Sequence, residues 1–186
     1  TVKDTLSLHD ALPISELQVA LVEYGNNGIP RERGFVRLRA NFTTDLDLLS
    51  EQLFGLRTHG GDEFCGHAIG VVNRELRWWD ERELRCGTPP APGRGAAAME
   101  AVREGLAGGG ARPDVGGPVV KILVIAGNEP FGQGSTPYRE TIAEARRNGV
   151  IVNTVHCGDR ATGASSGWEE GARLGGEVFV SFLRDI

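Results

Sequence analysis

Short apolar runs along the chain predict a set of β-strands. The most prominent is Val119–Ile125, which is interrupted only by Lys121 and ends in the turn residues Gly127–Pro130. An apolar run bounded by turn residues is typical of a strand buried on both faces in a parallel sheet. Two further runs, Val150–Val155 and Glu177–Phe182, predict strands of the same kind.

The first part of the chain predicts a β-hairpin. Leu17–Tyr24 is a strong strand pattern, and Phe35–Phe42 alternates apolar and polar residues as a half-exposed edge strand does. A loop rich in glycine, proline and charged residues separates the two runs. We therefore expect the two strands to be antiparallel neighbours.

Helical spacing of apolar residues predicts four helices. The first follows the N-cap candidates Thr43 and Thr44, with acidic residues in its opening turn. The segment Gly158–Gly167 is predicted to be a loop. The alternation of strands and helices towards the end of the chain predicts a parallel sheet with right-handed crossovers. The predicted helices are Asp45–Leu56, His67–Trp78, Pro137–Asn148 and Trp168–Leu174.

Two segments differ in composition from this core pattern. Asp80–Pro118 is rich in glycine, proline and alanine, which predicts a flexible insertion. Thr1–Ser15 has no clean period, and we interpret it as a non-native or disordered leader. The folded domain is therefore predicted to span residues 16–186, interrupted at 80–118.

Composition narrows the classes of function. The chain has 186 residues and a formal net charge of −5, so its overall field does not favour nucleic acid. No apolar run is long enough to span a bilayer, so we expect no membrane insertion. Three cysteines are too few for a disulfide scaffold and match no paired zinc spacing.

Six stretches, taken together and in order, carry a family resemblance: Leu17–Asn26, Phe42–Leu56, Gly60–Gly66, Lys121–Phe131, Glu140–Gly158 and Gly167–Phe179. This ordered set resembles a von Willebrand factor A-type domain of a bacterial branch. The resemblance implies a doubly wound, mostly parallel α/β sheet of Rossmann-like type, with helices on both faces. The first central strand of that fold has no counterpart upstream of Leu17.

The resemblance also implies a metal-ion-dependent adhesion site where the strands end. In such a site loops supply oxygen ligands to Mg²⁺, and an acidic residue of a protein partner completes the coordination. This chain offers Asp62, Glu63, Asn128 and Glu129 as candidate ligands, without the Asp-x-Ser-x-Ser motif of the family. Asn128 stands where an aspartate is usual, so we expect a degenerate site.

Cys65 and Cys157 are also placed at this end of the predicted sheet. They could form a disulfide, bind a soft metal together with His67 and His156, or act as the nucleophile of a hydrolase. They could equally be two ordinary small side chains.

The function expected from the sequence is a non-enzymatic protein-binding module for adhesion or scaffolding. The alternatives are an interaction scaffold without metal and a cysteine-dependent hydrolase. Domains of this type are often exported, although nothing in the sequence assigns a compartment. Because the central strand is missing, we also expect marginal stability, since unpaired buried backbone groups cost about 1–3 kcal/mol each.

Overall fold

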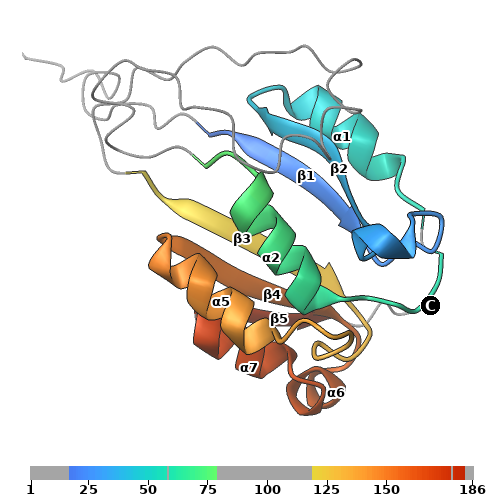
Figure 1. Ribbon diagram of the computed structural model, residues 1–186, viewed down its shortest axis with the longest axis vertical. Helices are drawn as coiled ribbons and strands as arrows, with labels where there is room; N and C mark the ends of the chain where they lie inside the picture. Colours follow the sequence, from blue (N-terminus) through green and yellow to red (C-terminus); the bar gives the residue numbers. More distant parts are fainter. Residues whose placement is uncertain (1–16, 58, 79–118, 177, 183–186) are drawn as a thin grey trace, which may run out of the picture.

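The computed structural model describes residues 17–57, 59–78, 119–176 and 178–182, and Figure 1 shows how they are arranged. The leader at 1–15 and the whole of the insertion predicted at 80–118 lie outside these residues. In chain order the elements are β1 (Val19–Tyr24), η2 (Arg31–Arg33), β2 (Val36–Thr43), α1 (Leu46–Phe54), α2 (Cys65–Glu75), β3 (Lys121–Gly127), α5 (Tyr138–Arg147), β4 (Val150–Cys157), α6 (Arg160–Ser165), α7 (Trp168–Gly175) and β5 (Phe179–Phe182).

The described strands form two separate sheets. β1 and β2 pair as the predicted antiparallel hairpin, with Glu23 opposite Arg37. β3, β4 and β5 form a parallel sheet in that order, which confirms the predicted parallel arrangement of the later strands. The two sheets share no ladder, so the continuous doubly wound sheet implied by the resemblance is not observed within the described residues.

The parallel sheet is covered on one face. Leu123 and Ile125 of β3 are buried, whereas the alternating Ile122 and Val124 are 50% and 62% exposed. The prediction that this strand is buried on both faces was therefore wrong for the described structure. A nearly continuous apolar run does not distinguish a strand covered on both faces from one covered on a single face.

The core lies between the covered face and the helices α2, α5 and α7 (Figure 1). Trp168 and Phe131 are fully buried, with their rings in edge contact at 4.8 Å. Ile69 of α2 and Ile142 of α5 are also almost fully buried. Burying such side chains contributes about 1.5–3 kcal/mol each, so this cluster is the main source of cohesion.

Local capping accounts for two differences from the predicted boundaries. Asp45 rather than Thr43 or Thr44 caps α1, because its carboxylate accepts the Leu48 N–H at 2.9 Å. The segment predicted as a loop at 158–167 contains α6, since Asp159 accepts the Thr162 N–H at 2.9 Å. Side-chain acceptors of this type satisfy the N–H groups that a helix start leaves unpaired.

Within the described residues, no helix has the length and apolar character needed to cross a lipid bilayer.

Candidate functional site

The carboxyl ends of β1, β3 and β4 meet at one edge of the molecule. The loop of residues 60–64, which precedes α2, joins them there, and its contacts with the β3–α5 loop fix their relative positions. We call the loops 60–64 and 126–133 together with residues 156–159 the rim. The rim contains the candidate residues predicted from the sequence at positions 62, 63, 128, 129 and 157.

Glu63 is the centre of the rim. Its Oε2 accepts the backbone N–H of Asn128 at 3.0 Å and that of Glu129 at 3.3 Å. Its own backbone N–H donates to Oε1 of Gln133 at 2.8 Å. A carboxylate that accepts two backbone N–H groups holds a loop firmly, because charge-assisted hydrogen bonds are the stronger kind. Glu63 therefore ties two loops together that are more than sixty residues apart in the sequence.

Gly127 leaves the space that Glu63 needs. A Cβ at this position would collide with Oε2 of Glu63 and would lie 2.6 Å from the Tyr24 hydroxyl. Tyr24 in turn donates its hydroxyl proton to the carbonyl of Ala126 at 2.7 Å. The absence of a side chain at Gly127 thus allows β1, β3 and the loop before α2 to meet.

Asp62, Asn128 and Glu129 surround this centre. Asp62 is exposed and has no hydrogen bond or ion pair to the described residues. The side-chain amide of Asn128 is 3.5 Å from Oε1 of Glu129. The structure therefore brings Glu63, Asn128 and Glu129 together through hydrogen bonds and leaves Asp62 free on the surface.

The arrangement of these residues leaves the predicted Mg²⁺ site untested. Among the described residues, no three His, Cys, Asp or Glu side chains converge as metal ligands would. One oxygen of Glu63 is already engaged by two N–H donors. Magnesium requires near-octahedral oxygen ligands at short distances, so the predicted metal site remains a prediction that this geometry does not support.

Both candidate cysteines, Cys65 at the start of α2 and Cys157 in the rim, are free thiols. Cys65 is fully buried at the start of α2, where burial, and then the charge of Glu63, raises the pKa of its thiol to about 12. The side chain of Cys157 is exposed at the surface. The loss of some of its water contacts, and then the negative charge of Glu63, raises the pKa of its thiol as well. Thiolates are the reactive and metal-binding form, so both environments oppose the chemistry of a nucleophile.

The two histidines do not pair with these thiols. His67 lies against Gly34, where a Cβ would collide with its ring. His156 is 1% exposed and packs beside Trp168 with ring centroids 5.7 Å apart. Neither histidine donates to or accepts from a cysteine among the described residues, so the Cys–His dyads considered from the sequence are not formed in this structure.

Trp168 is a buried residue that binds the rim loop carrying Glu129. Its indole N–H donates to the carbonyl of Glu129 at 2.9 Å, and its own carbonyl accepts the Thr154 hydroxyl at 2.9 Å. Its ring is fully buried against Phe131. Trp168 is therefore a core aromatic that also positions the loop carrying Asn128 and Glu129.

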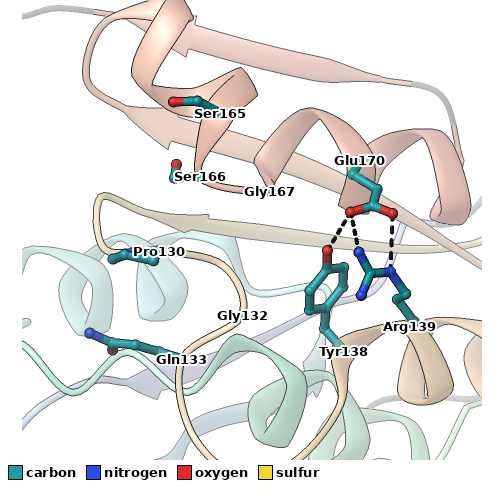
Figure 2. Close-up of a pocket in the computed structure, with 9 residues that line it drawn as sticks. All are labelled: Pro130, Gly132, Gln133, Tyr138, Arg139, Ser165, Ser166, Gly167 and Glu170. Atoms are coloured by element: carbon teal, nitrogen blue, oxygen red, sulfur yellow. Dashed lines mark hydrogen bonds and ion pairs between the residues drawn. The ribbon is translucent and has the colours of Figure 1, made fainter.

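An open pocket of about 510 Å³ adjoins the rim (Figure 2). The β3–α5 loop, the start of α5, the α6–α7 link and α7 line it. In Figure 2 the Glu170 carboxylate lies at one side, facing Tyr138 and Arg139. The lining residues are Pro130, Gly132, Gln133, Tyr138, Arg139, Ser165, Ser166, Gly167 and Glu170.

One carboxylate links the two helices beside the pocket. Glu170 accepts the Tyr138 hydroxyl at 2.6 Å and two N–H groups of Arg139 at 3.0 and 2.7 Å. Arg139, and then Tyr138, lower the pKa of Glu170. Burial, and then the bond to Glu170, raises the pKa of Tyr138. On this side of the pocket the charge of Glu170 is therefore balanced by Arg139, and its oxygens are already hydrogen-bonded.

Sequence reasoning did not identify Tyr24, Gln133 or the Tyr138–Arg139–Glu170 group as parts of this region. Tyr24 carries a signal in retrospect, since it ends a predicted strand directly before a glycine. The others join only through tertiary packing between α5, α7 and the loops, and no spacing in the sequence marks them.

Comparison of the chain with models of known families, with curated proteins and with solved structures found no match.

Proposed function

We propose that this chain is a non-enzymatic protein-binding module of the von Willebrand factor A type, which binds its partner through the rim. The hydrogen bonds from Asn128 and Glu129 to the Glu63 carboxylate carry this proposal. They give the rim a fixed shape built by the protein alone. A surface that is already ordered loses less conformational entropy when a partner binds.

The side chains on the rim match a recognition surface. Asp62 and Asn128 are exposed beside the ordered loop, and the open pocket continues the surface towards Arg139. Polar groups fixed around a shallow, open surface are typical of the outer part of protein interfaces. The buried, protonated state of Cys65 favours binding over a thiol-dependent reaction.

In this proposal the partner contacts the rim directly. A version in which Mg²⁺ bridges to an acidic residue of the partner needs Asp62, Asn128 and Glu129 to rearrange, because Glu63 is engaged by the loop. Isothermal titration with Mg²⁺ and Mn²⁺ separates the two versions. Direct contact predicts no saturable heat, and saturable binding that Asn128→Ala abolishes would replace it with the metal-bridged version.

Selection of binders tests the binding surface itself. A displayed library of protein fragments is selected on the wild-type chain, and each binder is measured against Asp62→Lys and Arg147→Glu. Arg147 is exposed at the end of α5, away from the rim, and its substitution reverses a charge in the opposite sense with the same magnitude. We expect affinity to fall about tenfold or more for Asp62→Lys and to stay unchanged for Arg147→Glu. Binders that do not respond to Asp62→Lys would overturn the proposal.

A further inference from the structure

Two asparagine residues of the chain are each followed by glycine, in the pairs Asn27–Gly28 and Asn148–Gly149. Such a pair can undergo deamidation, because glycine has no side chain to shield its backbone nitrogen from the asparagine side chain. The glycine nitrogen bonds to the asparagine Cγ atom and the Cγ–Nδ2 bond breaks. The proton of the glycine N–H passes through water to the departing amide nitrogen, which leaves as ammonia. Water then opens the cyclic imide at either carbonyl and gives aspartate or isoaspartate.

The pair Asn148–Gly149 is restrained at the end of α5. The side-chain amide of Asn148 donates to Oδ1 of the buried Asn73 at 3.2 Å. The Gly149 N–H donates to the carbonyl of Arg146 at 3.0 Å. Hydrogen bonds therefore hold both the leaving group and the attacking nitrogen of this pair.

The pair Asn27–Gly28 is restrained less. Both residues are exposed, in a turn closed by the Ile29 N–H, which donates to the carbonyl of Asn26 at 2.8 Å. The side chain of Asn27 forms no hydrogen bond to the described residues, so its leaving group is free. The restraint found on the attacking nitrogen is one exposed hydrogen bond, from the Gly28 N–H to Oδ1 of Asn26 at 2.8 Å.

We propose that Asn27 is a site of spontaneous deamidation in the folded protein. The same two-residue sequence reacts slowly at Asn148, because two hydrogen bonds must open there before the nitrogen can reach the side chain. The co-reactant is water, and no enzyme or cofactor is needed. The proposal does not depend on the binding proposed for the rim, so either one can fail without the other.

Asn27 lies against the loop that leads to Asp62. Its backbone N–H donates to the carbonyl of His59 at 2.7 Å. Its side chain covers Gly60, where a Cβ would collide with the amide group. Aspartate at this position places a carboxylate beside the rim, and isoaspartate adds a methylene group to the main chain. Deamidation therefore changes the charge and the backbone where these two loops meet.

The rates of conversion at the two asparagines test the proposal. The whole chain is incubated at pH 8, folded or in urea, and peptide mapping by mass spectrometry follows the replacement of the side-chain NH2 group by OH. In the folded chain we expect Asn27 to convert about tenfold faster than Asn148, because its leaving group is free. In urea the two rates should become similar, since neither pair keeps its hydrogen bonds.

Two variants separate the sites in the folded chain. Gly28→Ala adds a methyl group beside the attacking nitrogen and should slow conversion of Asn27 about tenfold. The added Cβ lies 3.0 Å from Oδ1 of Asn26, a side-chain atom that can move. Asn73→Ala removes the acceptor that holds Asn148 and should speed conversion there, with no effect at Asn27. Circular dichroism verifies that each variant is folded.

Three results would overturn the proposal. The first is an intact Asn27 in the folded chain under conditions that convert it in urea. The second is conversion of Asn148 in the folded chain at a rate equal to or above that of Asn27. The third is an unchanged rate at Asn27 in folded Gly28→Ala, since the attack would then not come from the backbone nitrogen. The first two need no variant, so the test holds even if a substitution prevents folding.

Discussion

Glu63 accounts for the shape of the rim at the scale of single residues. One carboxylate oxygen serves the backbone N–H groups of Asn128 and Glu129, and the neighbouring Asp62 makes no such contact. Adjacent acidic residues therefore have different roles, one structural and one available to a partner. The family resemblance treats both as candidate metal ligands and does not make this distinction.

Removal of the Glu63 carboxylate should destabilise the fold. We expect Glu63→Ala to lower the free energy of unfolding by about 1–3 kcal/mol, because it leaves two backbone N–H groups without an acceptor. Asp62→Ala is the matched control and should change it by less than about 0.5 kcal/mol. Urea denaturation measures both, and equal values for the two variants would contradict the assigned role of Glu63.

The two candidate cysteines, Cys65 and Cys157, should differ in reactivity. Cys65 is fully buried and its thiol stays protonated well above neutral pH, since its pKa is raised to about 12. Cys157 is exposed. Iodoacetamide at pH 8 should therefore modify Cys157 in the folded chain long before Cys65, as resolved by peptide mapping. Equal rates, or a peptide linked through both sulfurs, would contradict the free and unequal thiols.

At the scale of elements, α5 and α7 are joined beside the pocket by a carboxylate that titrates. Arg139 and Tyr138 lower the pKa of Glu170 below the usual value for glutamate. A lowered pKa means that Glu170 stabilises the fold above the pKa it has in the unfolded chain. That stabilisation is lost as the pH falls through the lower pKa of the folded state.

The pH dependence of unfolding should reveal this link. The difference in unfolding free energy between the wild type and Glu170→Gln should be constant from pH 6 to 8 and should shrink as the pH falls below the ordinary pKa of a glutamate side chain. Glu169→Gln, on the same helix with a more exposed side chain, is the control variant. Chemical denaturation at a series of pH values measures the difference, and a difference independent of pH would contradict the assignment.

The elements themselves were largely predictable because their signals are local. Apolar runs and helical spacing located all five described strands and the helices α1, α2, α5 and α7. α6 was missed because Gly163 and the serines around it are typical of loops, and Asp159 as its cap is a weak signal in isolation. The exposure of Val124 could not be predicted, since coverage of a strand face depends on which helices pack there.

The candidate site was predictable only in its location. Turn residues directly after strands placed Asn128 and Glu129 at the end of the sheet. The partners of Glu63, which lie more than sixty residues away in sequence, depend on the tertiary fold. The sequence does not show whether Glu63 binds a metal or holds the loop at Asn128 and Glu129, because the same carboxylate can do either.

At the scale of the whole molecule, the described fold consists of two sheets joined through α2 and the rim. A two-stranded hairpin is marginal by itself, so β1 and β2 depend on their packing against α2. Tyr24 bridges the space between the sheets with one hydroxyl group. The hydrogen bonds of the rim therefore hold the two sheets to one another, and the position of the rim loops is the central claim.

Nuclear magnetic resonance of the backbone amides tests that claim most directly. In Glu63→Gln the amide proton resonances of Asn128 and Glu129 should both shift, because the carboxylate oxygen that accepts these two N–H groups at 3.0 and 3.3 Å is lost. In Asp62→Asn, the matched control, they should stay in place, and the Thr162 amide, bonded to Asp159, should keep its resonance in both variants. Amide shifts of Asn128 and Glu129 that are unaffected by Glu63→Gln would show that the two loops do not meet.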